Sequence, residues 1–519
     1  MADSRSKNAS RNIVFAFANK ITAVLLPFVT RTITLYLLGE KYLGIGSLFS
    51  SVLSFLSLAD LGLGSAIVFS MYQPIAENDE DKICALLEYY KKFYRRIGIA
   101  ILTMGTLLVP VIPYLIKDEP PAGANVSILF YLYLLNSVIS YFFAGYKQSL
   151  LTAHQRTDII SKITLIVNVL VQAGQIAALV LTRSFYVYAV VPIAGTVVTN
   201  LLNLIVTNRR YPRLQCRGNL GIEDRKAIRK RLSGLVGTKL KSVVVHSADM
   251  LVISAFLGLT QNTIYGNYYY IINAVNAFVI LFFSSMTAGV GNSLVTETPE
   301  KNLKLFGTIS LINAWITGWC SVCLLCLFHP FMVLWVGERL SYSLGVEITL
   351  VVYFFVSSIQ RTILMFKDAA GIWYEDRYRP YVCMTMNVIL NVVLVQWIGI
   401  YGVTCSTIAA FLISVPWINF TLFRTLFQRS SISNLLKICY SVLVTTIAAG
   451  LTYFLTDMLP QGMRGSSGLG WLLVRFVICL VVPNVIFVVC YRFQPEFSQV
   501  MKLAKNGVKK LRLHGSGSV

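Results

Sequence analysis

Charged side chains are scarce in this sequence, and acidic ones are the scarcest. Only 13% of the 519 residues are Asp, Glu, Lys or Arg, and Lys plus Arg outnumber Asp plus Glu by 45 to 23. Soluble globular domains usually have about 25% charged residues. The low charge therefore excludes an ordinary soluble domain, and a mean hydropathy of +0.66 indicates a membrane protein.

Enzyme motifs are also missing. The sequence has no Walker A motif, which excludes direct use of ATP. Asp79-Glu80-Asp81 has D-x-D spacing, but no strand-rich sugar-nucleotide domain surrounds it, which favours a solvated loop. Cys320, Cys323 and Cys326 lie in an apolar run without a nearby His, where zinc thiolates are not expected. The ten cysteines are scattered and do not form a disulfide framework. We expect no enzyme activity, no cofactor and no metal.

Long apolar runs fill the chain instead. About 20 apolar residues cross a bilayer core as a helix, and backbone groups in lipid must hydrogen bond internally. The sequence therefore predicts an all-α polytopic membrane protein with about fourteen transmembrane helices. The predicted spans are 12–38, 44–71, 94–116, 126–150, 159–182, 186–207, 233–257, 264–290, 305–328, 346–366, 380–398, 402–424, 437–456 and 470–491.

Basic residues collect on alternate loops, which predicts an orientation. They are dense before residue 12 and in the stretches 91–96, 208–232 and 502–512, whereas the opposite loops have few. The positive-inside rule then places both termini in the cytoplasm, and an even number of spans agrees with this. Because the basic residues follow topology, the net charge of +22 favours contact with membrane lipids over nucleic acid. The first run is too long for a signal peptide and lacks a cleavage pattern.

The two halves of the chain resemble each other at an offset near 219 residues. Lys20 aligns with Lys239, Leu38-Gly39 with Leu257-Gly258, Asn168 with Asn387, and Lys147 with Lys367. Six spans in each copy would give both halves the same orientation, related by a pseudo-two-fold axis along the membrane normal. Parallel repeats of this kind occur in transporters that bind substrate between the halves.

This repeat predicts five segments. They are an N-lobe at 1–207, a basic cytoplasmic linker at 208–232, a C-lobe at 233–425, two further helices at 426–492, and a basic tail at 493–519. The last residues, Gly515 to Ser518, look like a cloning remnant. We expect two six-helix lobes with the two C-terminal helices outside the repeat.

Several short motifs, in their order along the chain, resemble bacterial polysaccharide flippases. The first half has Leu38-Gly39-Glu40 and Asp60-Leu61-Gly62-Leu63-Gly64. The second half has Tyr265-Gly266-Asn267-Tyr268, Thr287-Ala288-Gly289, Lys367-Asp368-Ala369, Asp376-Arg377, Asn387 and Gly399-Ile400-Tyr401-Gly402. The chain is similar over about 12–425 to the Wzx-like O-antigen and capsule exporters, which belong to the multidrug, oligosaccharidyl-lipid and polysaccharide exporter superfamily.

The resemblance implies a function. Members move an undecaprenyl-pyrophosphate-linked oligosaccharide from the inner to the outer leaflet of the bacterial plasma (inner) membrane by alternating access, without ATP hydrolysis. The implied partners are that lipid-linked glycan, membrane lipids, a coupling proton or sodium ion, and a polymerase of the same pathway. We expect a monomer, and the resemblance does not reveal the sugar.

Buried charges are the candidate functional residues, because a charge within a span costs several kcal/mol unless it has a role. Lys20 and Arg31 lie three turns apart on one face of the first span. Lys239 is the repeat partner of Lys20, and Arg361 lies in the tenth span. Arg grips phosphate through two nitrogens and Lys acts as a point charge. These residues are predicted to line a cationic cavity for pyrophosphate. For Lys20 and Arg31, snorkelling towards the membrane surface is the alternative.

Two further groups complete the predicted site. Asp60, Asp249 and His246 are candidates for charge pairing or ion coupling, because burial lets a carboxyl carry a proton and His titrates near neutral pH. A hydrogen-bonded core position remains the alternative for His246. The expected cytoplasmic gate or headgroup contact consists of Lys147, Arg156, Lys367 and Arg377, with simple positive-inside anchoring as the alternative.

Three other functions stay open. A drug exporter of the same superfamily should favour acidic groups in its cavity, whereas Lys and Arg dominate here. A membrane glycan polymerase or ligase needs a sizeable outer loop, and the predicted outer loops are short except around 329–345. A scaffold without transport is the third.

Overall fold

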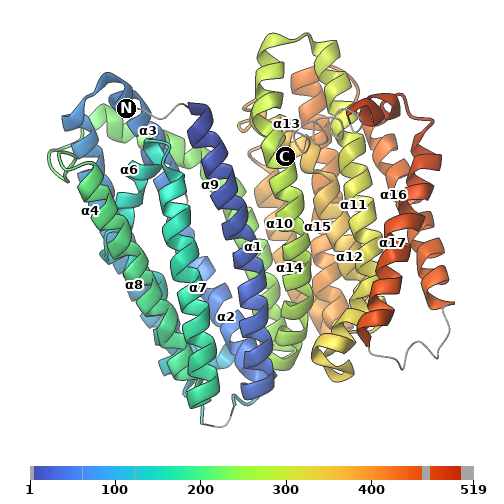
Figure 1. The fold of residues 1–519 in the computed structure, drawn as a ribbon, viewed down its shortest axis with the longest axis horizontal. Coiled ribbons are helices and arrows are strands. Elements are labelled where there is room, and N and C mark those ends of the chain that lie inside the picture. Colours follow the sequence, from blue (N-terminus) through green and yellow to red (C-terminus); the bar gives the residue numbers. More distant parts are fainter. Residues whose placement is uncertain (1–4, 61, 122, 459–467, 504–519) are drawn as a thin grey trace, which may run out of the picture. The chain divides into compact units, whose positions relative to one another are not determined.

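The described part of the chain is entirely helical. The computed structural model describes residues 5–60, 62–121, 123–458 and 468–503, and no strand occurs among them. The chain divides into two compact units, Met1–Gly266 and Asn267–Val519. In each unit the helices run side by side along its length (Figure 1).

The first unit contains nine α-helices and the start of a tenth. They are α1 (Arg5–Leu38), α2 (Glu40–Leu56), α3 (Leu63–Glu77), α4 (Glu80–Leu108), α5 (Val126–Phe142), α6 (Gln148–Ala153), α7 (Thr157–Thr182), α8 (Phe185–Arg210), α9 (Ile222–Phe256) and the start of α10 (Leu259–Thr296). Short 3-10 helices follow α2, α4 and α5, at Ser57–Asp60 (η1), Val109–Leu115 (η2) and Gly145–Lys147 (η3). Ile45, Leu48 and Phe49 of α2 are completely buried in the core of this unit.

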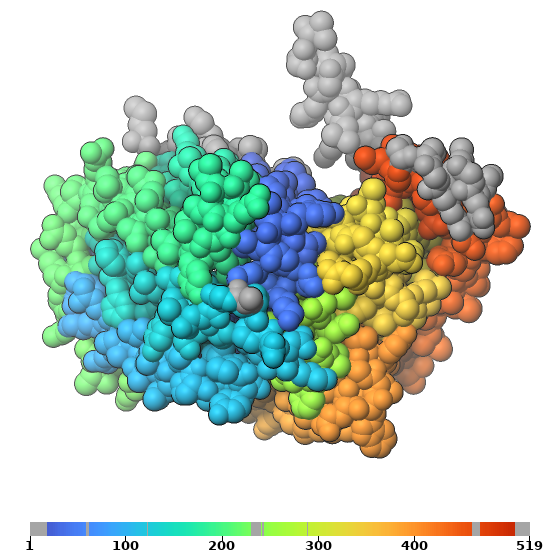
Figure 2. All heavy atoms as spheres, turned by 90° about the horizontal axis from the view of Figure 1, so that it is seen from below, coloured from blue at the N-terminus to red at the C-terminus, as the bar shows by residue number. Residues whose placement is uncertain are grey.

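The second unit takes up the rest of α10 and seven more α-helices. They are α11 (Pro299–Val336), α12 (Leu344–Ile359), α13 (Arg361–Ala369), α14 (Arg379–Ile398), α15 (Ile400–Leu422), α16 (Ile432–Asp457) and α17 (Gly468–Tyr491), with η4 (Glu338–Leu340) and the π-helix η5 (Phe423–Phe427). Helices α16 and α17 pack on α11, and Figure 2 shows yellow atoms of α11 beside red atoms of α17. Phe306, Phe366, Phe423 and Phe427 form an aromatic cluster at another point of the core.

Eleven of the described helices are long and apolar enough to cross a membrane, or twelve if the bent pair formed by α5 and Gly145–Ala153 counts as one span. That pair bends by 52°. The two other predicted spans take different forms. The 44–71 segment is broken into α2 and α3, and Gly62 has a φ of 85° at the start of α3. The 233–257 segment continues a longer helix, whose apolar part is Val243–Phe256.

Helix α9 starts earlier than the predicted linker and lobe boundary suggest. It begins at Ile222, within the predicted 208–232 linker, and Glu223 and Asp224 lie in its first turn. Acidic residues there stabilise the positive end of the helix dipole. The two units also divide at Gly266, because the start of α10 packs on the first unit: Thr263 donates a hydrogen bond to the Glu40 carbonyl, and Leu259 N–H donates to Asp118.

Glycine permits a close contact between two helices of the second unit. A Cβ added to Gly402 of α15 would lie 2.4 Å from the carbonyl carbon of Leu394 in α14. We expect Gly402→Ala to lower the free energy of unfolding by about 1–3 kcal/mol, since overpacking forces the helices apart. Thermal unfolding in detergent, followed by tryptophan fluorescence, measures this effect. Gly450→Ala in α16 is the control, because a Cβ at Gly450 meets nothing within 4 Å; equal losses in the two variants would contradict the packing argument.

Candidate functional site

A cavity of about 300 Å³ lies within the first unit. Arg31 of α1 and four serines of α2 line it, together with Tyr42, Tyr133, Phe185 and Tyr188. No Asp or Glu is among its lining residues in the part of the chain that the structure describes. The cavity therefore joins one cation, several hydroxyls and an aromatic wall, a combination that suits an anionic, hydroxyl-rich ligand.

The serines form a stripe along one face of α2. Ser47, Ser50, Ser51 and Ser54 have the spacing i, i+3, i+4, i+7, which places them on one side of a helix. Ser50 donates its hydroxyl hydrogen to the Gly46 carbonyl at 2.8 Å, and Ser54 donates to the Ser50 carbonyl at 2.7 Å. Each oxygen keeps lone pairs for an incoming donor. Sequence reasoning missed this stripe, although its spacing is visible in the sequence.

Arg31 is half-buried and is held against the start of α10. Its Nη2 donates to the Thr263 carbonyl at 3.4 Å. A Cβ on Gly266 would lie 3.0 Å from the same nitrogen, so the missing side chain leaves room for the guanidinium. Arg31 is thus the predicted cationic residue that the structure places on a cavity wall.

The aromatic residues of the wall contact one another. The ring centroids of Tyr42 and Phe185 are 5.0 Å apart, and those of Phe185 and Tyr188 are 5.1 Å apart. A Cβ on Gly46 would lie 2.9 Å from the Tyr133 hydroxyl. Glycine at this position therefore lets the Tyr133 hydroxyl approach α2 at the cavity.

Among the other predicted cavity residues, Lys20 and Arg361 have described side chains. The Lys20 side chain is exposed on α1, and that of Lys239 in α9 lies outside the described residues. Arg361 belongs to the second unit, where its Nη2 donates to Asn276 Oδ1 at 3.1 Å. Arg361 Nε is buried without a hydrogen-bond partner among the described residues.

The predicted coupling residues are only partly described. The side chains of Asp60 and His246 lie outside the described residues. Asp249 of α9 is 2% exposed and accepts a hydrogen bond from the Tyr265 hydroxyl at 3.1 Å. It neighbours Met250, which lines the cavity. The role of these three residues stays a prediction.

The predicted gate residues of the first unit have local partners. Lys147 is 6% exposed and donates to Asn208 Oδ1 at 2.9 Å, which connects the bend after α5 with the end of α8. Arg156 binds Asp158 through two nitrogens, at 2.9 and 3.2 Å. Both cations are paired within the unit, and their gate role is not tested by these contacts.

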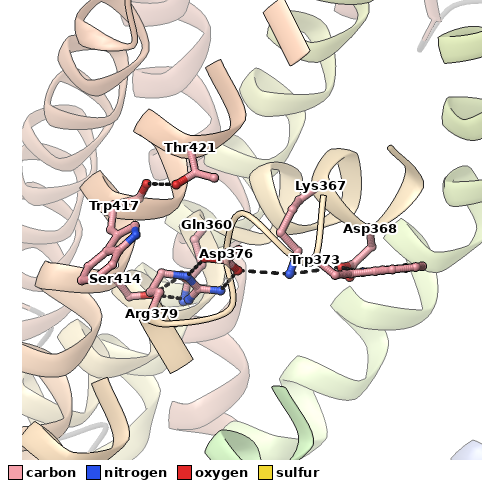
Figure 3. A network of polar contacts seen from close by, with 9 residues as sticks. All are labelled: Gln360, Lys367, Asp368, Trp373, Asp376, Arg379, Ser414, Trp417 and Thr421. Atoms are coloured by element: carbon pink, nitrogen blue, oxygen red, sulfur yellow. Dashed lines mark hydrogen bonds and ion pairs between the residues drawn. The ribbon is translucent and has the colours of Figure 1, made fainter. Parts of the chain in front are cut away.

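The matching region of the second unit contains a buried ionic network (Figure 3). Lys367 is 2% exposed and lies 3.2 Å from Asp376 and 3.3 Å from Asp368. Arg379 binds both oxygens of Asp376 at 2.6 Å. Arg379 also donates to Ser414, which donates to Gln360. The network joins α13, the following loop, α14, α15 and the residue that precedes α13.

Sequence reasoning found only part of this network. Arg379 was missed, although it begins α14 only three residues after Asp376, close enough in the chain for an ion pair. Arg377, the predicted gate residue, lies outside the network. Its guanidinium lies 3.8 Å from the ring centre of Tyr374 and 4.5 Å from that of Tyr378. A hydrogen bond with the Tyr378 hydroxyl raises the pKa of Arg377.

The comparisons with known structures define the class of protein. The chain is similar to lipid II flippase MurJ in an inward closed conformation, with 15% identity, a TM-score of 0.64, and 92% of this chain and 99% of that chain covered. It is also similar to an inward-facing MATE family multidrug resistance transporter of the MOP superfamily (16% identity, TM-score 0.61, 76% and 94% covered). A variant of the Vibrio cholerae MATE transporter VcmN gives 12% identity, a TM-score of 0.56, and 82% and 98% covered. At identities this low, the likeness shows the fold alone. The chain is a multi-pass membrane protein with the fold that MurJ and these MATE transporters share.

The sequence comparison gives the family. The profile described as polysaccharide biosynthesis protein matches residues 9–288, more than half of the chain. The chain therefore belongs to the polysaccharide biosynthesis protein family. This confirms the resemblance to polysaccharide flippases that was predicted from the sequence. A search of curated proteins found no match.

The buried network yields a prediction about stability. Asp376→Asn should leave Lys367 and Arg379 without their shared carboxylate, and breaking such a buried pair costs about 3–5 kcal/mol. Thermal unfolding in detergent measures the loss. The matched control is Asp368→Asn, because the Asp368 side chain is 55% exposed and an exposed pair contributes at most about 1 kcal/mol. Equal shifts in melting temperature would show that the network does not stabilise the second unit.

Proposed function

We propose that this protein is a flippase that moves an undecaprenyl-pyrophosphate-linked oligosaccharide, a repeat unit of a surface polysaccharide such as O-antigen or capsule, from the inner to the outer leaflet. The observation that carries the proposal is the cavity of the first unit, where Arg31 faces hydroxyls and aromatic rings in a member of the polysaccharide biosynthesis family. The protein would act in the bacterial plasma membrane, with both termini in the cytoplasm.

Each part of the cavity matches a part of this substrate. The Arg31 guanidinium presents donors in a fork that fits two phosphate oxygens. Serine oxygens accept hydrogen bonds from sugar hydroxyls, and the rings of Tyr42, Phe185 and Tyr188 offer apolar faces to the sugar ring. The polyprenyl chain would stay in the lipid while the polar head crosses through the protein. Alternating access without a cofactor completes the proposal.

A drug exporter of the same fold is the competing function, since MATE transporters share the fold. A site for cationic drugs would need a negative group, and the charged residue on the cavity wall is Arg31. This charge favours an anionic ligand. A membrane polymerase or ligase has no support in the cavity, where the described lining residues include no carboxylate or His for acid–base chemistry.

Energy coupling remains a separate proposal. Because no nucleotide motif exists, net movement follows an ion gradient or the consumption of substrate by a downstream polymerase. Proton antiport through Asp60 is the version predicted from the sequence. A protonated Asp60 would release its cationic partner, Lys20 or Arg31, which could then hold pyrophosphate.

Arg31→Gln tests the pyrophosphate contact. We expect it to weaken binding of undecaprenyl pyrophosphate, measured by native mass spectrometry, by about 10- to 100-fold, because hydrogen bonds to charged groups contribute about 1.5–3 kcal/mol. Arg31→Lys should retain part of the affinity, since it keeps the charge and loses the fork. Flipping of an undecaprenyl-pyrophosphate-linked sugar in proteoliposomes should fall in parallel.

The controls separate the two candidate functions. Arg183→Gln removes an exposed arginine at the end of α7 and should leave binding and flipping unchanged. Ethidium transport serves as the drug-export arm. Unaltered lipid binding in Arg31→Gln would remove the proposed contact, and ethidium export without lipid binding would favour the exporter.

The Lys20→Ala, Lys239→Ala double variant tests the remaining cavity prediction. Both residues occupy the same repeat position, and an ammonium in lipid without a partner is costly. We expect loss of glycan export in cells at normal protein abundance. Full export by the double variant, measured as surface polysaccharide against immunoblotted protein, would exclude a shared role.

A further inference from the structure

A buried carboxyl group in the second unit plays no part in the proposed substrate site. Glu347 lies in the first turn of α12 and is 0% exposed. Its Oε1 accepts a hydrogen bond from the Tyr268 hydroxyl at 2.7 Å. Its Oε2 is buried without a hydrogen-bond partner in the part of the chain that the structure describes. A carboxylate with an unsatisfied oxygen costs several kcal/mol in a low-dielectric interior.

The Tyr268 hydroxyl connects Glu347 with the segment between α11 and α12. Tyr268 is 0% exposed, and its oxygen accepts a hydrogen bond from the Tyr342 backbone N–H at 3.0 Å. The two tyrosine rings stack with centroids 5.2 Å apart. A relay thus runs from the Tyr342 N–H through the Tyr268 hydroxyl to Glu347, and it fixes the connecting segment 337–343.

His329 gives this carboxyl group a path to the surface. Its Nδ1 lies 3.6 Å from Glu347 Oε1, and its side chain is 52% exposed, against 0% for Glu347. His329 precedes the end of α11 at Val336 by about two helical turns. The distance is slightly longer than a hydrogen bond, so a small rotation of the exposed ring brings the groups into contact.

The other titratable groups around Glu347 leave this pairing intact. Tyr268 from α10 and His329 from α11 act on Glu347 directly. Tyr453 from α16 lies within electrostatic range of Glu347, and Tyr453 also interacts with Asp457 and with Arg475 from α17. Among these groups, His329 is the one whose ring can take a proton at one nitrogen and release a proton from the other.

We propose that Glu347 and His329 form a proton-binding site that controls how firmly the 337–343 segment is held. His329 Nε2 takes a proton from water while Nδ1–H passes its own proton to the Glu347 carboxylate. Imidazole returns to neutral as the other tautomer, and the carboxylate becomes a carboxylic acid. One proton moves from water to Glu347. This site goes beyond the proposed function, because it requires no glycan.

Protonation changes the relay. While Glu347 is ionised, Tyr268 donates to it and keeps its oxygen free for the Tyr342 N–H. A proton on Oε1 makes Glu347 a donor to the Tyr268 oxygen, where it competes with that N–H. The 337–343 segment should then open more often, and by the predicted topology this segment faces the outside.

Infrared difference spectroscopy of the full-length protein in detergent tests the site without any substrate. A pH decrease should produce the band of a protonated carboxyl group, and Glu347→Gln should lose that band. Glu338→Gln is the matched control, since it removes an exposed carboxylate of the same connection. In this variant the carboxyl band of Glu347 should stay. A band that survives in Glu347→Gln would overturn the proposal.

Hydrogen exchange of the 337–343 peptide supplies the second readout. After correction for intrinsic rates, exchange in the wild type should increase as pH falls, whereas Glu347→Gln should exchange fast at every pH. His329→Gln changes an exposed position and should fold even if Glu347→Gln does not. It should delay appearance of the carboxyl band after a pH jump. Unchanged band kinetics in His329→Gln would refute the proton route through His329. Exchange that does not depend on pH in the wild type would refute the control of the 337–343 segment. Glycan flipping is not measured, so failure of the proposed function does not affect this outcome.

Discussion

The low-dielectric interior is the constraint on which the rest of this structure depends. A polar group between apolar helices is costly there unless it finds a partner, because no water replaces a lost hydrogen bond. Asp376 meets this demand by serving two cations at once. Asn387 and Asn391 of α14 meet it through hydroxyls of α15, with Thr407 accepting from Asn387 and Ser406 donating to Asn391. Helix packing and polar pairing are therefore solved together.

The two units use their polar groups differently. In the second unit the cations Lys367 and Arg379 are closed into a buried network around one carboxylate. In the first unit, Lys147 has the neutral Asn208 as its partner, and Arg31 stays half-exposed on a cavity wall. A closed network gives rigidity, whereas a cation on the wall of a cavity can meet an incoming anion. Whether a cation lies in a closed network or on a cavity wall thus decides what it can bind.

Glycines and serines determine the shape of the cavity as much as the charged residue does. Gly266 leaves room for the guanidinium of Arg31, and Gly46 lets the Tyr133 hydroxyl approach α2. Ser50 and Ser54 of α2 satisfy their own donors on the helix backbone and present acceptors to the cavity. A polar surface can therefore line a membrane protein without unpaired donors, which suits a ligand that brings many hydroxyl hydrogens.

Composition and hydropathy by themselves determined the all-α membrane class, since only helices satisfy the backbone in these apolar runs. The order of short motifs determined the family, and the charge of Arg31 marked one residue of the cavity. Tertiary structure decided what linear patterns do not contain. The 44–71 run is interrupted before α3 at Gly62, and the chain bends after α5. Asp376 became the shared partner of Lys367 and Arg379. Tertiary structure also placed Glu347 beside His329, eighteen residues away on another helix. Partner choice depends on which helix faces pack together, and hydropathy does not specify those faces in a chain whose helices are apolar nearly all round.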